Sequence, residues 1–195
     1  MDFGTFSKST FTLGRSMSGY FNKHGDYIEG PVIPIDQVFY AEAWAQAVER
    51  TGQNGALARQ TETGNHDYFQ RQLIGALAER TVLSTFTGAE MNPDPRGYWD
   101  IMYRGVRLEV KGKHPNFRYL YAYENDRHKV ADYWVSVVVD IDQGFTAIVG
   151  YVSQEDLFSD ENEFLWDDHN VNKRRMGYRV PYSALHTYGR GPLFL

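Results

Sequence analysis

The stretch that decides the fold reads Trp99-Asp100-Ile101-Met102-Tyr103-Arg104-Gly105-Val106-Arg107-Leu108-Glu109-Val110-Lys111. After Arg104-Gly105, apolar and polar residues alternate strictly, which predicts a β-strand, because side chains on a strand point to opposite faces with period two. We therefore expect two short strands joined by a tight turn at Arg104-Gly105. One face of the second strand then carries Arg107, Glu109 and Lys111, and the other carries Val106, Leu108 and Val110.

The composition is that of one globular domain. The chain has 195 residues, of which 42% are hydrophobic and 23% charged, so a single domain spanning 1–195 with a full core is expected. It contains no cysteine, which excludes disulfides and thiolate metal sites and fits a reducing compartment. Met1 to Leu13 lacks the pattern of a signal peptide, and no run approaches 18 apolar residues. We expect a cytoplasmic (intracellular) protein with no membrane partner.

The charges are unevenly distributed. The net charge is -5, but seven acidic residues and no Lys or Arg lie between Glu155 and Asp168, so the rest of the chain carries +2. From Val171 to the end there are five basic residues and no acidic ones. The overall acidity therefore does not exclude a nucleic-acid partner. The simpler alternative is a solvated acidic loop beside a solvated basic one.

The first part of the chain predicts an arm and two helices. Residues 1–34 are rich in Gly, Ser, Phe and Tyr and read as an N-terminal arm with one short strand around Tyr27 to Ile35. A helix follows over Val38 to Glu49, with Asp36 as N-cap and Gly52 as its end. A second helix is expected from His66 to Phe86, between a cap at Asn65 and a stop at Gly88. Its apolar side holds Phe69, Leu73, Ala76 and Leu83, with Glu79 at the margin and Arg80, unexplained, near the middle.

The second part predicts a sheet. Met91 to Gly97 is a turn, Tyr119 to Tyr123 is a third strand, and Tyr133 to Asp140, nearly all apolar, is a central strand. Phe145 to Val149 pairs back on it, and Tyr178 to Tyr182 reads as a last strand. The fold class expected is α/β (α+β), with a mixed central β-sheet flanked by helices, a core over 66–140 and a C-terminal extension over 155–195.

Three residues of the opening stretch suggest a site. If the two strands pair around their turn, Asp100 and Glu109 lie nearly opposite each other. Two adjacent carboxylates repel, which favours a raised pKa or a bound cation, and Mg²⁺ prefers carboxylate oxygens. Lys111, on the same face, would reach a metal-bound water or a phosphate, and partial burial near a metal can depress its pKa.

Asp100 followed by Glu109-Val110-Lys111 resembles the motif of the PD-(D/E)XK nuclease superfamily. The family pattern also places a Glu on the preceding helix, here Glu79, and its core order of helix, three-stranded meander, helix and strand fits His66 to Val139. The resemblance implies a restriction-endonuclease-like core. It implies metal binding by Asp100, Glu109 and the carbonyl of Val110, with Mg²⁺ or Mn²⁺ as the ion. It also implies a catalytic set of Asp100, Glu109, Lys111 and Glu79.

The chain departs from the family pattern at one position and leaves simpler readings open. Trp99 stands where the family often has Pro, and Asp94, after Pro93, is the weaker candidate because it lies in a turn. Without a site, Asp100 is a turn former at a strand end, Glu109 and Lys111 are a solvated pair, and Glu79 is a surface charge. His128 and Lys129 lie where the family often has a second basic or polar residue, although a surface run is an equal reading.

The segment from Arg104 to Lys129 suits a phosphate backbone. It holds seven basic and three acidic residues, an excess of four positive charges. The residues expected to bind nucleic acid are Arg107, Lys113, Arg118, Arg127 and Lys129. Tyr119, Tyr121 and Tyr123 are further candidates, for stacking on bases or for ordinary packing.

The function expected is a metal-dependent nuclease, a hydrolase of DNA phosphodiester bonds. The resemblance makes a homodimer a further expectation, because two DNA strands need two cuts. The alternative is a catalytically silent nuclease-like domain that serves as a DNA- or protein-binding module in a phage or mobile-element assembly.

Overall fold

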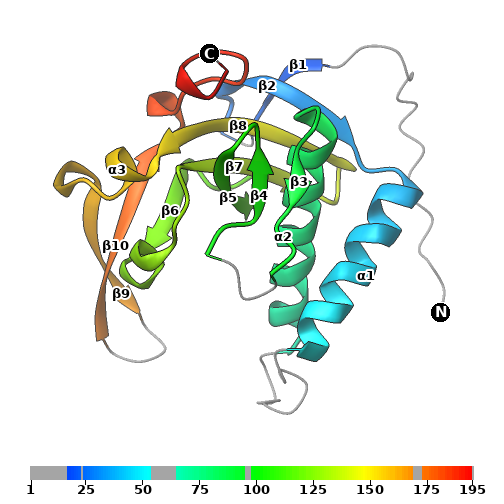
Figure 1. The fold of residues 1–195 in the computed structure, drawn as a ribbon, viewed down its shortest axis with the longest axis horizontal. Helices are drawn as coiled ribbons and strands as arrows, with labels where there is room; N and C mark the ends of the chain where they lie inside the picture. The colour runs from blue at the N-terminus through cyan, green and yellow to red at the C-terminus, as the bar shows by residue number, and fades with distance from the viewer. Residues whose placement is uncertain (1–16, 23, 54–64, 95–97, 169–172, 195) are drawn as a thin grey trace.

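The computed structural model describes residues 17–22, 24–53, 65–94, 98–168 and 173–194. The chain is a mixed α/β protein with two sheets (Figure 1). The main sheet has seven strands in the order β1-β2-β8-β7-β5-β4-β3, and the small sheet has three in the order β6-β10-β9. The main-sheet strands are β1 (Met17–Phe21), β2 (Tyr27–Pro34), β3 (Glu90–Met91), β4 (Ile101–Tyr103), β5 (Val106–Lys113), β7 (Tyr133–Asp140) and β8 (Phe145–Ser153). The small-sheet strands are β6 (Tyr119–Tyr123), β9 (Glu163–Asp168) and β10 (Lys173–Pro181), and the helices are α1 (Gln37–Gln53), α2 (Asn65–Thr85) and α3 (Gln154–Leu157).

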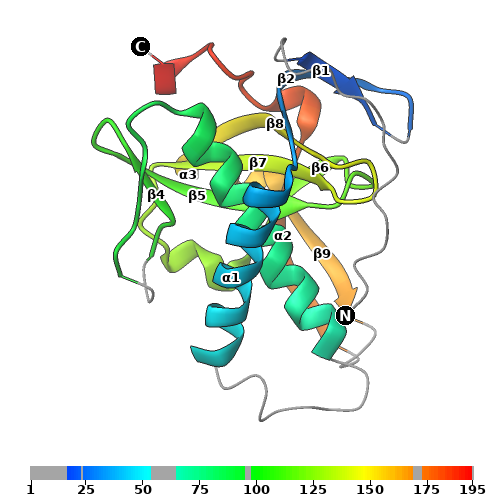
Figure 2. The ribbon, with the colours of Figure 1, turned by 90° about the vertical axis from the view of Figure 1, so that its right-hand side faces the viewer.

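The main sheet separates two hydrophobic cores. Alternate residues of β7 point to opposite faces: Val135, Val137 and Val139 join the core beneath α1 and α2, whereas Trp134 and Val138 join the core beneath the small sheet. Figures 1 and 2 show α1 and α2 on one side of β5 and β7 and the small sheet on the other. The expected central strand is confirmed, since β7 is buried on both faces from Trp134 to Asp140.

Both long helices are confirmed close to their expected bounds. The Phe39 N–H donates a 2.8 Å hydrogen bond to Oδ1 of Asp36, so Asp36 caps α1 as predicted. After α2, Gly88 adopts a left-handed conformation with φ of +84°. Glycine adopts this conformation without a steric penalty because it has no Cβ, so the chain can turn away from the helix here.

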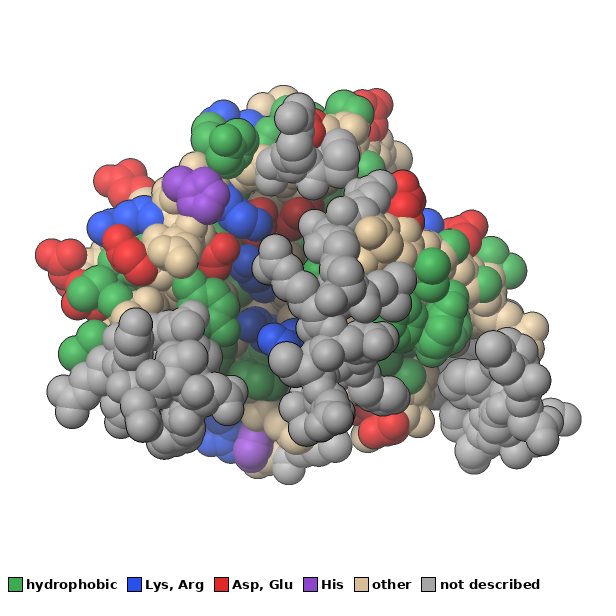
Figure 3. Space-filling view, turned by 90° about the horizontal axis from the view of Figure 1, so that it is seen from below, with side chains coloured by type: hydrophobic (Ala, Val, Ile, Leu, Met, Phe, Trp, Pro, Cys, Tyr) green, Lys and Arg blue, Asp and Glu red, His purple; other side chains and the backbone are tan. Residues whose placement is uncertain are grey.

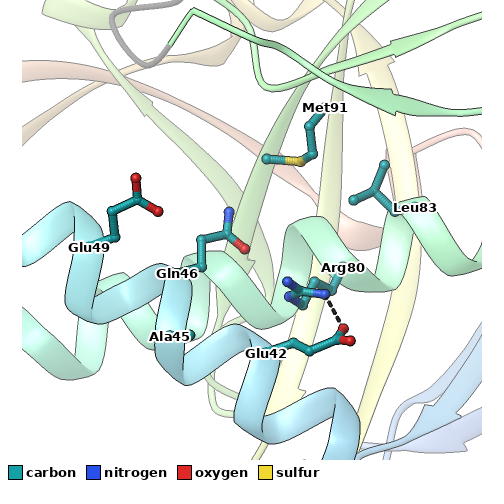
Figure 4. Close-up of a pocket in the computed structure, with 7 residues that line it drawn as sticks. All are labelled: Glu42, Ala45, Gln46, Glu49, Arg80, Leu83 and Met91. Carbon is teal, nitrogen blue, oxygen red and sulfur yellow. Dashed lines mark hydrogen bonds and ion pairs between the residues drawn. The ribbon is translucent and has the colours of Figure 1, made fainter.

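Arg80, which lay unexplained in the apolar stripe of the sequence, has a partner on the other helix. Its guanidinium forms an ion pair with Glu42 of α1 (Figure 4). The pair sits at the edge of an open pocket of about 560 Å³ between α1, α2 and β3. Neither Asp100 nor Glu109 lines this pocket, whose lining residues are Glu42, Ala45, Gln46, Glu49, Arg80, Leu83 and Met91.

The predicted hairpin at Arg104-Gly105 is confirmed. Both turn residues have positive φ, 51° and 80°, as a type I′ turn requires, and this turn matches the twist of paired strands. β4 and β5 pair antiparallel with Ile101 opposite Leu108, and β5 continues parallel to β7.

The third strand of the meander is not the one expected. Tyr119–Tyr123 is a strand, but it leaves the main sheet and pairs with β10 as β6. The free edge of the hairpin is extended instead by β3, which pairs with β4. The physical reason is that β7 already occupies the other edge of β5, and Pro115 has no N–H with which to continue a ladder.

The two ends of the chain also contribute strands. The strand expected near Tyr27 is confirmed as β2, which pairs with β8, and β1 adds a strand that was not predicted. Two strands of the expected N-terminal arm, Met17–Phe21 and Tyr27–Pro34, are thus part of the main sheet, while residues 1–16 lie outside the described part. The expected last strand begins earlier, at Lys173, and its partner β9 lies within the acidic segment. No helix of the described residues is long and apolar enough to cross a membrane.

Candidate active site

Asp100 directly precedes β4, beside β5. Its N–H donates a 2.9 Å hydrogen bond to the Leu108 carbonyl, which extends the hairpin pairing by one residue. Its side chain is held as well, because the Val110 N–H donates to Oδ2 at 2.8 Å. The hairpin register therefore brings Asp100 next to Glu109 on the neighbouring strand.

Glu109 is a buried carboxylate, with 2% of its surface exposed. Two lysines contact its Oε1: the Lys111 ammonium lies 3.0 Å away, and the Lys129 ammonium forms a close ion pair with the same oxygen. The other oxygen, Oε2, is buried and accepts no hydrogen bond from any described residue. Because a buried polar atom normally has a partner, this oxygen is a candidate ligand atom for a cation.

Lys111 is enclosed by opposite charge. Its ammonium lies 3.8 Å from Oδ2 of Asp126 and 4.9 Å from the centre of the Trp134 ring. Burial lowers the pKa of Lys111, but the charges of Glu109 and Asp126, with the hydrogen bond to Glu109, outweigh it and leave the pKa raised. The depressed pKa expected for this lysine is therefore wrong: its pKa is raised.

The pKa of Asp100 is also raised, but for a carboxyl this favours the neutral form. Burial raises the pKa of its carboxyl to about 8, and the nearby charges of Glu109 and Glu79 add to the effect. The Lys129 charge and the Val110 N–H oppose this rise without cancelling it. Once Asp100 ionises, three carboxylates, with that of Asp126, face two lysine ammoniums, and this excess of one negative charge favours a bound cation.

Glu79 lies on α2 and faces α1. It is 4% exposed, and the guanidinium of Arg50 donates two hydrogen bonds to it, of 2.8 Å to Oε1 and 2.5 Å to Oε2. Gln46 donates a third, at 2.9 Å. Both oxygens are thus engaged, and Glu79 reaches Asp100 only through its charge. The sequence offered no signal for Arg50 or Gln46 as partners, because they lie on another helix.

A metal site here would rest on two carboxylates. Among the residues that the structure describes, no group of three or more His, Asp or Glu side chains is arranged to hold a metal ion. Mg²⁺ is commonly held by one or two carboxylates and completes its shell with water and phosphate. Asp100, which carries a raised pKa, and Glu109, whose Oε2 accepts no hydrogen bond from any described residue, fit that donor set.

The basic residues expected to bind nucleic acid are mostly paired within the protein. Arg107 grips Asp132 through Nε and Nη2, and Arg118 lies 3.4 Å from Asp26. Lys113 differs: no ion pair joins it to a carboxylate of the described residues, and it packs on aromatic rings. The remaining pairs are Arg127 with Glu124 and Lys129 with Glu109.

The face of the molecule drawn in Figure 3 is hollowed. In Figure 3, Lys and Arg side chains follow one another along a hollow, and acidic side chains lie deep at one end of it. The small sheet lies to one side of this view and the helices to the other. No protein-family model matches the chain, and no curated protein has a significantly similar sequence.

Proposed function

We propose that the chain is a metal-dependent nuclease that hydrolyses DNA phosphodiester bonds, with Asp100 and Glu109 as metal ligands. One observation carries the proposal: the buried carboxylate of Glu109, whose Oε2 accepts no hydrogen bond from any described residue, lies beside a second acid, Asp100, whose pKa is raised to about 8. Two lysines contact the other oxygen of Glu109. Perturbed acids clustered with lysines are typical of sites that do chemistry rather than of solvated surfaces.

In this proposal the carboxylates bind the metal ion, and the lysines stabilise negative charge. A bound Mg²⁺ would polarise a phosphoryl oxygen and lower the pKa of a water molecule. Lys111 has a raised pKa, so it is an ammonium at neutral pH; it donates a hydrogen bond to the attacking water or the phosphate and does not remove a proton. Lys129 neutralises Glu109 and holds it in place. The carbonyl of Val110 is the third ligand in this proposal, by analogy with the family motif.

The order of elements supports a restriction-endonuclease-like core. Helix α2 precedes the antiparallel meander β3-β4-β5, and β7 follows parallel to β5. The connection from β5 to β7 departs from the family pattern, because it contains β6 and only a short 3-10 turn at Glu124–His128 where the pattern has a helix. The proposal therefore depends more on the site residues than on topology.

Cleavage tests the proposal directly. Plasmid, linear and branched DNA are incubated with the wild-type chain and Mg²⁺ or Mn²⁺, beside Asp100→Asn and Lys111→Ala. Glu42→Gln is the matched control, because it removes a carboxylate–cation pair of α1 and α2 that lies outside the site. We expect cleavage by the wild type and the control only. Equal activity in all four proteins would point to a contaminant and overturn the proposal.

One observation favours the non-catalytic alternative, a nuclease-like binding module. The ammonium groups of Lys111 and Lys129 already balance the carboxylates of Glu109 and Asp126, so the site carries no net charge whenever Asp100 is protonated. Calorimetric titration with Mn²⁺ at a pH above 8 separates the two functions. Uptake that Asp100→Asn abolishes supports the nuclease. Absence of uptake, with DNA binding retained, supports the module.

A further inference from the structure

The small sheet presents a face of aromatic rings next to the candidate active site. Along β6, Leu120 and Ala122 are buried in the core, so the alternating tyrosines point to the opposite face. Four of the rings pack on one another: Tyr121 lies 5.7 Å from Tyr119, 5.7 Å from Phe164 and 6.0 Å from Phe117 between ring centres. Tyr123 is the next outward-pointing residue along β6. We call Phe117, Tyr119, Tyr121, Tyr123 and Phe164 the aromatic face.

The aromatic face is open at both ends. Tyr123 is 49% exposed and Phe117 is 43% exposed. Gly177, on β10, leaves room for the Phe164 ring, because a Cβ there would lie 3.1 Å from the ring. The sheet thus supports the rings from below and leaves part of their surface to solvent.

Two cations lie among these rings. Lys113 lies 5.5 Å from the Tyr121 ring centre and 5.6 Å from that of Phe117, and Arg179 lies over Tyr119 and Phe164 at 5.2 and 5.1 Å. In the described part of the chain, no carboxylate forms an ion pair with either cation. Their charge is therefore available to a phosphate, unlike that of Arg107 or Arg118.

The face is continuous with the proposed site. Lys113 is the last residue of β5, on the same face of that strand as Glu109 and Lys111, and its ammonium reaches the rings of the aromatic face. A polymer that enters the site at Glu109 would therefore meet Lys113 and then the tyrosines of β6.

We propose that the aromatic face binds single-stranded DNA by stacking its bases on the rings, and so delivers a single-stranded segment to the active site. Tyr119, Tyr121 and Tyr123 recur about every 6.6 Å along β6, a spacing suited to the bases of an extended strand. A sheet whose aromatic residues stack two or three bases is an established way to hold a single strand, whereas a duplex hides the faces of its bases. The inference rests on the proposed nuclease function, for which it names the substrate class.

Binding in EDTA, which prevents cleavage, tests the stacking. Fluorescence anisotropy is measured with a labelled oligothymidylate, with a strand of equal length whose internal sites are abasic, and with a blunt duplex. The abasic strand keeps the phosphates and removes the bases, so it isolates stacking from charge. We expect the oligothymidylate to bind at least about 5-fold more tightly than either of the others.

Variants of the exposed rings assign the effect. Tyr123→Ala and Phe117→Ala should each weaken oligothymidylate binding between about 5-fold and 100-fold and leave abasic binding unchanged, whereas Tyr123→Phe should bind like the wild type. Phe21→Ala is the matched control, because Phe21 is an aromatic residue 72% exposed on β1, outside the aromatic face. Equal affinity for the base-bearing and abasic strands, or tighter binding of the duplex, would overturn the inference.

The two proposals fail separately. Cleavage that depends on Asp100, together with equal binding of abasic and base-bearing strands, would support the proposed nuclease function and refute the proposed base stacking. Base-dependent binding that Tyr123→Ala abolishes, in a protein that cleaves no substrate, would support base stacking on the aromatic face and refute the proposed nuclease function.

Discussion

The ammonium of Lys129 lies on Oε1 of Glu109, although Glu109 is on β5 and Lys129 lies 20 positions later, directly after the 3-10 turn. Lys111 shares that oxygen, so one carboxylate oxygen holds two cations while its neighbour Oε2 holds none among the described residues. This asymmetry determines how the site should respond to mutation, pH and metal.

Replacing Lys129 with Met should destabilise the metal-free chain and strengthen metal binding. A hydrogen bond to a buried charge is lost, which costs about 1.5–3 kcal/mol in the free energy of unfolding, although Lys111 remains as a partner. The same change removes a positive charge beside the metal ligands. Urea unfolding in EDTA and calorimetry with Mn²⁺ measure the two effects, and Lys129→Arg is the control that keeps the charge. Weaker Mn²⁺ binding by Lys129→Met would contradict the prediction.

The metal-free chain should lose stability as the pH rises from about 4 to about 8. Burial raises the pKa of Asp100 to about 8, so in this window the folded chain holds a proton that the unfolded chain has released. The stabilisation is complete below the unfolded pKa and is lost as the pH passes the folded pKa, a change on the order of a few kcal/mol. Urea unfolding in EDTA across this range should show a slope that Asp100→Asn abolishes. An identical slope in that variant would exclude Asp100 as the cause.

Arg50→Met should unfold more easily than the wild type by about 3 kcal/mol. It leaves Glu79 buried with Gln46 as its only described donor, and a buried charge without its counter-ion is strongly destabilising. Adding Glu79→Leu should restore much of the loss, because an apolar pair replaces the ionic one. Glu42→Gln, which breaks the exposed pair with Arg80, should cost less than about 1 kcal/mol. Chemical denaturation of the four proteins distinguishes these values.

Gly112→Ala should destabilise the packing of α2 on β5. A Cβ at this position would lie 2.6 Å from the Ile74 carbonyl oxygen and 3.0 Å from Cβ of Ala78, so the helix must shift. Such overpacking costs about 1–3 kcal/mol, and the shift should also reduce cleavage, because Lys111 is the preceding residue. Gly52→Ala is the control: nothing lies within 4 Å of its Cβ, and α1 should gain about 0.5–1 kcal/mol. Thermal melts that rank the two variants in the opposite order would refute this account.

Lys113→Gln should reduce the salt dependence of single-stranded DNA binding more than Arg118→Gln. Each phosphate neutralised on a single strand contributes about 0.7 to the slope of log affinity against log salt. Lys113 has no carboxylate partner in the described chain, whereas Asp26 lies 3.4 Å from Arg118. Anisotropy at several salt concentrations gives the slopes, and equal slopes for both variants would show that the internal pairing is irrelevant.

Local patterns in the sequence were sufficient for the elements near the site. The strict alternation after Gly105, the Asp36 cap and the apolar run at Val135 predict the hairpin, α1 and β7, because each depends on residues close together in the chain. The same patterns bring Asp100 opposite Glu109, since a tight turn fixes the register of its two strands.

Tertiary structure alone decided which strands share a sheet and which charges meet. Alternating tyrosines indicate that Tyr119–Tyr123 is a strand. It joins the small sheet because β7 already pairs with the edge of β5 and β10 pairs with β6, and neither pairing can be read from the local sequence. Likewise, nothing near Glu109 in the sequence indicates that Lys129 will neutralise it, or that Arg50 will grip Glu79. The amino-acid sequence by itself determined the hairpin and the order of its charged residues. The packing of distant segments determined their burial, partners and pKa values, because these depend on the three-dimensional surroundings of each group.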